Sequence, residues 1–422
     1  MVMIKHDLTN YYNKEEFDKP DRRELRLFED FNKKLIKICK LSDGWNKILN
    51  KIDLNEIRCR KDLEKLPIVR KSDLPNLQSQ NLPYGGLSTK DPLDFPYIFA
   101  SPGPIYEPGN NNDFWDLCSC LYSAGLRKES LVYNTFSYHL GPAGIMFSNS
   151  IKYLGASVIA GGIGNTDIQL ETIKNLKPDF YIGTPSFLKI LLEKAEDKKI
   201  NITSIKNGVV GAEPLPNSLR KSLKNKGVEV MQMYGTAEVG CIAYESKNAK
   251  KQINEGMIVE ENIILEIVRP GTNFRVKDGD VGEVVVTKIT NDYPMIRLAT
   301  GDLSAIIKDL SPCGRTNIRI KGWMGRAEQS TKFKGIFITP NQVNSLLKQF
   351  KEVSKVKFII NNENHLDKGE LICETEKISE LLKESIKNYF KSANKINVEV
   401  KLVKIDNLPN DGIVIEDKRS HK

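Results

Sequence analysis

The stretch QMYGTAEVG, residues 232–240, is the part of the chain from which the rest can be interpreted. The residues just before it, from 227, have β-branched and alternating side chains that suit a strand. We therefore predict a strand, a tight glycine turn and then polar residues at the strand's end, where open α/β sheets place ligands. Tyr234 could stack on a base, the Thr236 hydroxyl could reach a phosphate, and the Glu238 carboxylate suits Mg²⁺. An ordinary turn with a surface glutamate explains the same residues.

Length and composition indicate a soluble protein with more than one domain. The chain has 422 residues, more than one hydrophobic core usually serves. With 40% hydrophobic and 28% charged residues, it has ample material for a core. The formal charge of +9 comes from lysines spread along the chain, which favours a solvated surface over nucleic-acid binding.

Cysteine usage and hydropathy give no sign of export or membrane insertion. The seven cysteines form no paired framework, and nothing near Cys118 and Cys120 completes a metal site. The N-terminal residues lack an apolar signal core, and no run approaches the roughly 20 apolar residues of a membrane span. We therefore expect reduced thiols, a cytoplasmic location and no membrane partner.

Predicted strands alternate with predicted helices in the middle of the chain. The strands are 131–133, 155–160, 179–182 and 208–210, and the helices end near 152 or cover 169–176 and 185–196. Thr184 before Pro185 is a good N-cap for the last helix. This alternation predicts a parallel, doubly wound sheet and so the α/β fold class.

The flanking regions have other patterns. Apolar residues at spacings of three and four predict amphipathic helices in the first 60 residues. Residues 66–74, LPIVRKSDL, predict a turn and a short helix capped by Ser72. Residues 96–109 predict a strand and a loop that either cradles a phosphate or forms a rigid turn, before a helix at 113–125. Residues 258–268 and 282–288 alternate as antiparallel strands.

Several further polar residues follow predicted strands or turns. Asp302 could accept both hydroxyls of a ribose, and Arg297 could meet an acidic partner. Each could equally be a surface charge in a turn. Gly211, after the strand 208–210, would let a flat ring approach the backbone. His139 could touch a ligand, although a lone histidine is usually structural.

The order of the motifs is more informative than any one of them. The chain contains YGTAE (234–238), RLATGD (297–302), CGRT (313–316), GRAE (325–328) and GIFITP (335–340) in this order. Together they resemble the adenylate-forming (AMP-binding) superfamily, and within it the phenylacetate–coenzyme A ligases. LPIVRKSDL (66–74), GNT (164–166) and GTPSF (183–187) fit the same family. The resemblance covers roughly residues 60–350.

This resemblance implies a fold and an activity. The adenylate-forming fold has a large N-terminal domain of sheets and helices, here 1–325 with a helical lead-in at 1–60, and a small mobile α+β lid, here 326–422. The implied activity is ATP-dependent ligation of phenylacetate, or a similar aryl or small carboxylic acid, to coenzyme A through an acyl-AMP. The implied cofactors are ATP, Mg²⁺ and coenzyme A, and a homodimer is left open.

The resemblance also implies roles for individual residues of this chain. The cofactor-binding set lies around the nucleoside, with Tyr234 against the base and Asp302 on the ribose; its remaining members are Gly211, Ala212, Glu213, Pro214 and Gly235. The implied catalytic set is Thr236 on the α-phosphate, Glu238 on Mg²⁺, and Arg326 near ribose and phosphate. Glu328 would lie at the hinge of the lid.

Two segments depart from the family's pattern where it binds phosphate. The loop ASPGPIYEP (100–108) stands where the family has Ser, Thr, Gly and a Lys, and Glu107 would repel a triphosphate unless it is turned away. Ile413 follows LPNDG (408–412), where the family has its catalytic Lys, and Lys418 would substitute only if the tail shifted. These departures favour an alternative, a nucleotide- or acyl-adenylate-binding protein with a degenerate active site.

Two serines of the chain argue against a zinc site. Ser246 and Ser311 stand where many relatives have cysteines, which leaves Cys313 without partners for zinc. A second alternative function is an adenylyl transferase that does not use coenzyme A.

Overall fold

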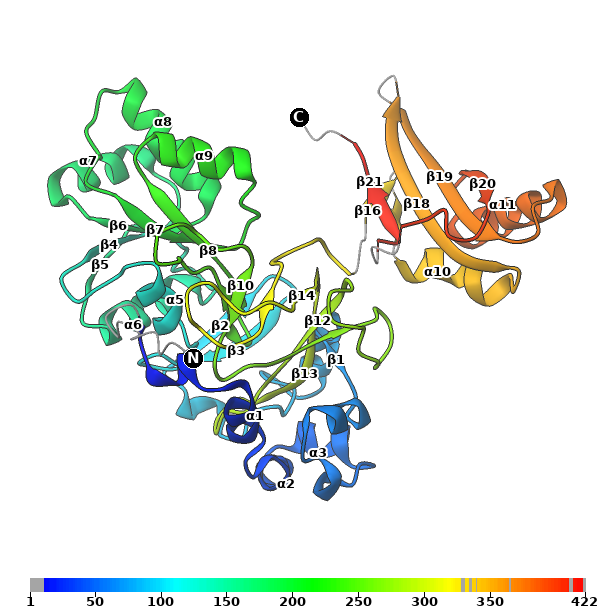
Figure 1. Ribbon diagram of the computed structural model, residues 1–422, viewed down its shortest axis with the longest axis horizontal. Helices are drawn as coiled ribbons and strands as arrows, with labels where there is room; N and C mark the ends of the chain where they lie inside the picture. Colours follow the sequence, from blue (N-terminus) through cyan, green and yellow to red (C-terminus); the bar gives the residue numbers. More distant parts are fainter. Residues whose placement is uncertain are drawn as a thin grey trace, which may run out of the picture.

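The structure is a computed structural model that describes residues 11–327, 331–333, 336–338, 340–363, 366–409 and 413–419 (Figure 1). Its mixed helices and strands agree with the predicted α/β class. The described strands form one nine-stranded sheet, two four-stranded sheets and two hairpins. Among the helices so described, none combines the length and the apolar character needed to cross a bilayer.

The nine-stranded sheet has the order β14-β15-β10-β9-β8-β7-β6-β4-β5. Its parallel strands are β4 (Leu131–Asn134), β5 (Ser157–Ala160), β6 (Phe180–Gly183), β7 (Asn207–Val210) and β8 (Glu229–Thr236). The connecting helices are α6 (Ala143–Tyr153), α7 (Thr166–Leu176), α8 (Pro185–Asp197) and α9 (Asn217–Asn225). The predicted alternation is confirmed, and so is the Thr184 cap, whose hydroxyl accepts the Phe187 N–H at 3.3 Å.

An antiparallel half extends this sheet beyond β8. It consists of β9 (Gly240–Tyr244), β10 (Met257–Val259), β14 (Ile306–Ile307) and β15 (Arg319–Ile320). Strand β8 pairs with β9 as far as Thr236. The predicted turn at Gly235 is therefore wrong, because this glycine lies within the strand. A Cβ there would lie 2.3 Å from the carbonyl oxygen of Gly240, so only glycine fits the close pairing.

A four-stranded sheet in the order β1-β13-β12-β11 lies under the N-terminal helices. Its strands are β1 (Val69–Arg70), β11 (Ile264–Val268), β12 (Gly282–Lys288) and β13 (Met295–Ser304). The antiparallel pairing of β11 with β12 confirms the prediction for these residues, although residues 257–259 belong to the other sheet as β10.

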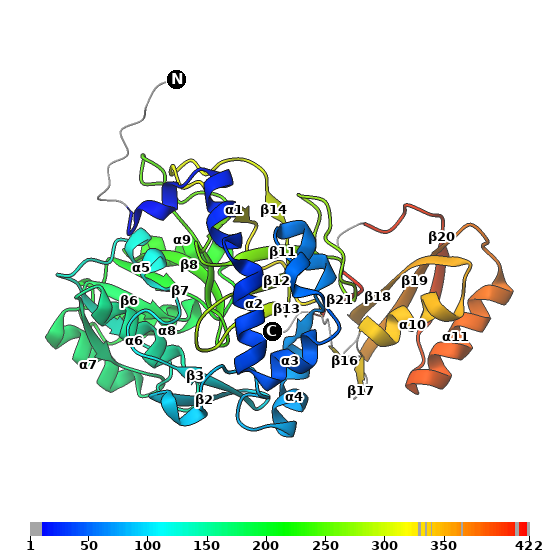
Figure 2. The same cartoon turned by 90° about the horizontal axis from the view of Figure 1, so that it is seen from below.

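The helices predicted in the first 60 residues are present. They are α1 (Pro20–Phe28), α2 (Phe31–Leu41) and α3 (Asp43–Leu49). Short 3₁₀ helices accompany them at η2 (Lys14–Phe17), η3 (Leu54–Glu56), η4 (Arg60–Lys65) and, further on, η6 (Pro92–Asp94). Helices α2 and α3 lie beside the β1-β13-β12-β11 sheet (Figure 2). Phe31, Leu35 and Trp45 are buried in one core with residues of β11, β12 and β13. Their apolar face therefore covers this sheet.

The segment predicted as a phosphate loop is a β-hairpin. Strand β2 (Tyr97–Ser101) pairs with β3 (Ile105–Gly109) through a turn at 102–104. The prediction missed β3 because its Pro108 and Gly109 suggest a loop, yet a two-stranded hairpin consists of edges that tolerate proline. The helix predicted at 113–125 is shorter and is α5 (Cys118–Ser123).

The segment 66–74 also differs from its prediction. Ser72 does not cap the helix α4 (Leu74–Gln80), because it lies inside a 3₁₀ turn, η5 (Lys71–Asp73), that leads directly into α4. Strand β1 fixes the start of this turn, since Arg70 pairs with Ala299 of β13.

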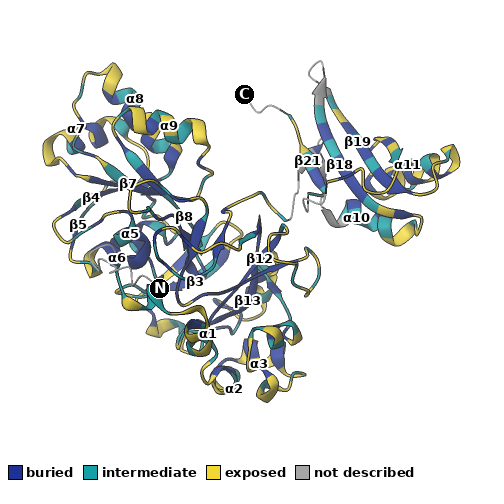
Figure 3. Cartoon of the chain, in the orientation of Figure 1, coloured by how far each residue is buried: buried dark blue, intermediate teal, exposed yellow. Residues whose placement is uncertain are grey.

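The C-terminal part has a hydrophobic core of its own, which includes Phe358, Leu371 and Phe390. Buried positions occur along its strands β18 and β19 (Figure 3). Its main sheet has the order β20-β19-β18-β21. Its elements are β16 (Thr331–Phe333), β17 (Ile336–Ile338), α10 (Pro340–Gln349), β18 (Val353–Glu363), β19 (Leu366–Thr375), α11 (Glu380–Asn394), β20 (Glu399–Val403) and β21 (Ile415–Asp417).

Candidate active site

Asp302 is the centre of a hydrogen-bonded cluster between strands of the two sheets. The Tyr234 hydroxyl, from β8, donates to Asp302 Oδ2 at 3.0 Å. Trp323 Nε1 and Arg326 Nη1 donate to Oδ1, each at 3.0 Å. Asp302 is only 7% exposed, so protein donors satisfy most of its carboxylate. Burial, followed by the Asp302 charge, raises the pKa of Tyr234 well above its ordinary value and keeps this hydroxyl a donor.

Thr300 and Gly301, just before Asp302, shape the cluster. The Tyr234 hydroxyl also lies 3.0 Å from Thr300 Oγ1. Gly301 has φ +77°, and a Cβ there would lie 3.1 Å from Arg326 Nη2. A larger residue would crowd the guanidinium and adopt a disfavoured backbone conformation. The glycine therefore lets Arg326 reach the carboxylate.

Thr236 and Glu238 lie just beyond Tyr234, at the end of β8 and in the turn to β9. Glu238 is 5% exposed and pairs with Lys71, whose Nζ lies 2.9 Å from Oε1 and 3.1 Å from Oε2. The hydroxyl oxygen of Thr236 is buried and has no hydrogen-bond partner within the described part of the chain. Sequence reasoning missed Lys71, which is 167 residues from Glu238 and carries no local signal.

Glu107 of β3 lies near enough to Glu238 for their charges to interact. It is fully buried, and the Ser101 hydroxyl donates to its Oε2 at 3.0 Å. Its Oε1 has no hydrogen-bond partner among the residues described. Burial, followed by the charge of Glu238, raises the pKa of Glu107 to about 8. The carboxyl group is thus turned into the interior, away from the surface of the hairpin turn.

The segment 211–214 follows the carboxyl end of β7, the strand next to β8. Gly211 packs against β8, since a Cβ there would lie 3.0 Å from Met233 Sδ. Ala212 has φ +64°, and the carbonyl of Glu213 accepts a hydrogen bond from Gln232 Nε2 at 3.3 Å. Pro214 is exposed before α9. The two neighbouring strands therefore carry this segment and Tyr234 at the same end of the sheet.

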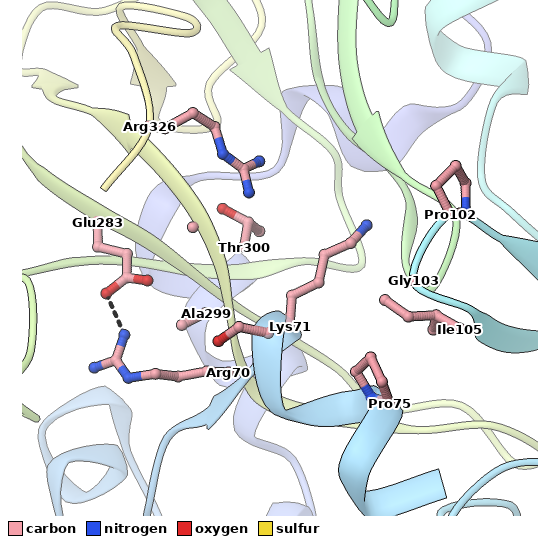
Figure 4. Close-up of a pocket in the computed structure, with 12 residues that line it drawn as sticks. Arg70, Lys71, Pro75, Pro102, Gly103, Ile105, Glu283, Ala299, Thr300 and Arg326 are labelled. Atoms are coloured by element: carbon pink, nitrogen blue, oxygen red, sulfur yellow. Dashed lines mark hydrogen bonds and ion pairs between the residues drawn. The ribbon is translucent and has the colours of Figure 1, made fainter. Parts of the chain in front are cut away.

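A pocket of about 210 Å³ joins the Asp302 cluster to the turn of the β2–β3 hairpin (Figure 4). It is lined by Arg70, Lys71, Ser72, Pro75, Pro102, Gly103, Ile105, Glu283, Ala299, Thr300, Gly301 and Arg326. Arg70 Nη1 lies 2.6 Å from Glu283 Oε2, whereas half of the Arg326 side chain is exposed. Among the described residues, the lining thus contains three cations and one carboxylate.

The oxygen atoms around Glu238 fit a magnesium ion. Mg²⁺ binds hard oxygen ligands, which carboxylates and hydroxyls provide. Thr236 Oγ1 and Glu107 Oε1 are buried and have no hydrogen-bond partner among the described residues. Unpaired buried oxygens are unusual, and a bound metal ion would give such an oxygen a partner. Glu238 is therefore the residue that would hold the ion, with Thr236 beside it.

Arg297 lies outside this site. Its Nε is 3.0 Å from Glu266 Oε2, and both side chains are fully buried. Its Nη1 also donates to the carbonyl of Leu66 at 2.6 Å. The acidic partner expected for Arg297 is confirmed, and the pair belongs to the core.

The remaining predicted site residues lie away from the pocket or outside the residues that the structure describes. Glu328 and residues 410–412 lie outside the described residues. Lys418 is exposed, with its Nζ 3.5 Å from Glu416 Oε1. Cys313 Sγ lies 3.1 Å from Ser311 Oγ, and no group of three or more His, Cys, Asp or Glu residues suited to a metal occurs in the described ranges.

The known proteins similar to this chain include AMP-binding enzymes and phenylacetate-coenzyme A ligases. The family of AMP-binding enzymes matches residues 121–291. A phenylacetate-coenzyme A ligase of Thermus thermophilus is 28% identical over 337 residues, which cover 76% of this chain and 74% of the relative. That of Escherichia coli K12 is 27% identical over 330 residues, covering 74% and 73%.

A solved structure supports the fold. It is a 2-hydroxyisobutyryl-CoA ligase in complex with 2-HIB-AMP and CoA, 20% identical in sequence, with a TM-score of 0.71 over 97% of this chain and 93% of that chain. The family match over residues 121–291 and the similarity to several phenylacetate-coenzyme A ligases support the resemblance of this chain to the phenylacetate–coenzyme A ligase-like members of the adenylate-forming superfamily.

Proposed function

We propose that the protein is an ATP-dependent carboxylate–coenzyme A ligase that activates phenylacetate, or a similar aryl or small carboxylic acid, as its acyl-AMP. The observation that carries this proposal is the cluster of Tyr234, Asp302 and Arg326 at one end of the pocket. It combines an aromatic ring, a carboxylate and a cation, and the candidate metal ligand Glu238 lies just beyond Tyr234. The similarity to phenylacetate-coenzyme A ligases over 76% of the chain supports it.

In this proposal the nucleoside lies between the ends of β7 and β8 and Asp302. Tyr234 lies against the base, which is bordered by Gly211, Ala212, Glu213, Pro214 and Gly235. Asp302 accepts hydrogen bonds from the ribose hydroxyls. These hydroxyls replace the donors Trp323 and Arg326, whose partly exposed side chains have room to move.

The residues at the phosphate end of the site must neutralise the negative charge of the phosphates and of the substrate carboxylate. Adenylation brings a carboxylate to an α-phosphate, so hydrogen-bond donors and cations lower the barrier. The Thr236 hydroxyl donates to the α-phosphate, Arg326 supplies a cation, and Glu238 would hold Mg²⁺. When bound, Mg²⁺ would neutralise phosphate charge as a Lewis acid.

We further propose that residues 1–325 and 326–422 are two domains and that the second moves between adenylation and transfer to coenzyme A. The separate core of the C-terminal part supports movement as a unit. Arg326 stands at the boundary, so its bond to Asp302 links the two parts.

The test is pyrophosphate release from ATP and Mg²⁺ with a panel of acids, including phenylacetate and benzoate, with and without coenzyme A. We expect release to rise with one acid and a thioester to form once coenzyme A is present. Asp302→Asn should lower kcat/KM by about 10–100-fold, because it removes a charged acceptor for ribose. A circular dichroism spectrum checks that the variant folds. Equal turnover in this variant would contradict the assignment of Asp302.

The hairpin turn favours a second candidate, an acyl-adenylate-binding protein with little adenylation activity. Its residues Pro102, Gly103 and Pro104 carry no cationic side chain, and Ile413 stands where the family has its catalytic lysine. This candidate predicts that ATP binds without pyrophosphate release for every acid tested, while a synthetic acyl-AMP still binds.

A further inference from the structure

The turn of the β2–β3 hairpin offers few groups that could bind phosphate. Pro102 and Pro104 have no backbone N–H, which leaves Gly103 as the donor between them. A triphosphate in this pocket needs cations or several N–H groups to balance its charge. Those cations must come from other elements of the lining.

Three cations line the pocket, and their partners distinguish them. Arg70 is held by Glu283, a carboxylate that is 2% exposed, so its charge is already balanced by a buried group. Arg326 is bonded to Asp302, and the proposed function already assigns its charge to the α-phosphate. Lys71 is bonded to Glu238, the residue assigned to the metal ion.

The backbone of Lys71 is held by its neighbours, whereas its side-chain ammonium can move. Its backbone follows β1, which pairs with β13, and begins η5. Its side chain is 27% exposed, and Figure 4 shows it extending across the pocket toward the space between Thr300 and Pro102. A lysine ammonium on a flexible stem can rotate from one acceptor to another.

We propose that Lys71 is the cation that contacts the outer phosphates of ATP in this site and supplies the charge that the hairpin turn lacks. The inference rests on the proposed function. Its ammonium exchanges the carboxylate of Glu238 for the β- and γ-phosphate oxygens of ATP. A metal ion on Glu238 would compete with Lys71 for the same two oxygens, so binding of Mg²⁺ and release of Lys71 favour each other.

The test measures affinity by calorimetry with ATP and with AMP, each in the presence of Mg²⁺. Lys71→Met should weaken ATP binding by about 10–100-fold, because a charge-assisted contact to the outer phosphates is lost. AMP lacks these phosphates, so its affinity should change by less than about threefold. Lys128→Met serves as a matched control, since Lys128 is 78% exposed and lies outside the pocket lining.

Lys71→Arg separates a charge effect from a structural one. It keeps the cation and should bind ATP at least about fivefold more tightly than Lys71→Met. An unchanged ratio of ATP to AMP affinity in Lys71→Met would overturn the inference and leave the proposed function standing. Equal loss of both ligands in both Lys71 variants would assign the residue a structural role and also overturn it. If the unaltered protein binds neither nucleotide, the proposed function fails, and the inference fails with it.

Discussion

Two buried carboxylates of this protein hold cations in different ways. Glu266 and Arg297 are both fully buried, and the backbone carbonyls of Leu66 and Asn273 accept two further guanidinium hydrogens. Glu238 is also buried, but its partner Lys71 is 27% exposed and lines a pocket. The first pair completes a core, whereas the second leaves a cation that can change its partner. The exposure of the partner, more than the burial of the carboxylate, therefore distinguishes the two roles.

The largest effect on stability is expected for Arg297→Met. It leaves Glu266 as a buried charge without its partner, so the free energy of unfolding should fall by about 3–5 kcal/mol in a urea titration. Combining it with Glu266→Met should recover most of the loss, because no buried charge then remains. A single variant as stable as the unaltered protein would show that the pair is not structural.

A smaller effect on stability is expected for Glu238→Gln. Lys71 can turn to water, so the free energy of unfolding should fall by no more than about 1 kcal/mol. The affinity for ATP should nevertheless lose its dependence on Mg²⁺ concentration, which a titration at several concentrations would reveal. A loss of stability as large as that of Arg297→Met would remove the difference between the two pairs.

The smallest effect is expected for an exposed pair on α8. Lys189 Nζ lies 3.3 Å from Glu193 Oε1, and both side chains are nearly half exposed. Lys189→Ala should lower the free energy of unfolding by about 0.3–0.5 kcal/mol, since water screens such pairs. The same urea titration sets this baseline. If the loss exceeded 1 kcal/mol, exposure would be a poor guide to the weight of an ion pair in this protein.

Local signals in the sequence were sufficient for most of the fold. The Thr184 cap and the apolar spacing of α2 act within a few residues, so they could be read directly. Strand β3 and the start of α4 differ from their predictions. In both, tertiary context overrode local preference: a partner strand accommodates Pro108, and β1 brings the chain into η5 with Ser72 inside the turn.

The site residues also divide into those that local motifs predict and those that depend on contacts between distant segments. Motif order pointed to Tyr234 and Asp302, which the structure joins by a hydrogen bond. Lys71 was overlooked because its meaning depends on Glu238, a partner far away in the sequence. The inward orientation of Glu107 likewise depends on Ser101 across the hairpin. Contacts between distant segments leave no periodic pattern that a single sequence could reveal.

The bond between Asp302 and Arg326 has a thermodynamic consequence. A nucleoside that takes both oxygens of Asp302 must release Arg326, the residue that leads into the C-terminal part. The nucleoside and Arg326 compete for Asp302, and such coupling is reciprocal. The factor by which the bond to Arg326 weakens nucleoside binding is therefore the factor by which the nucleoside weakens that bond. If the proposed function holds, the position of the C-terminal part and the occupancy of the nucleoside site would therefore depend on one equilibrium at the Asp302 carboxylate.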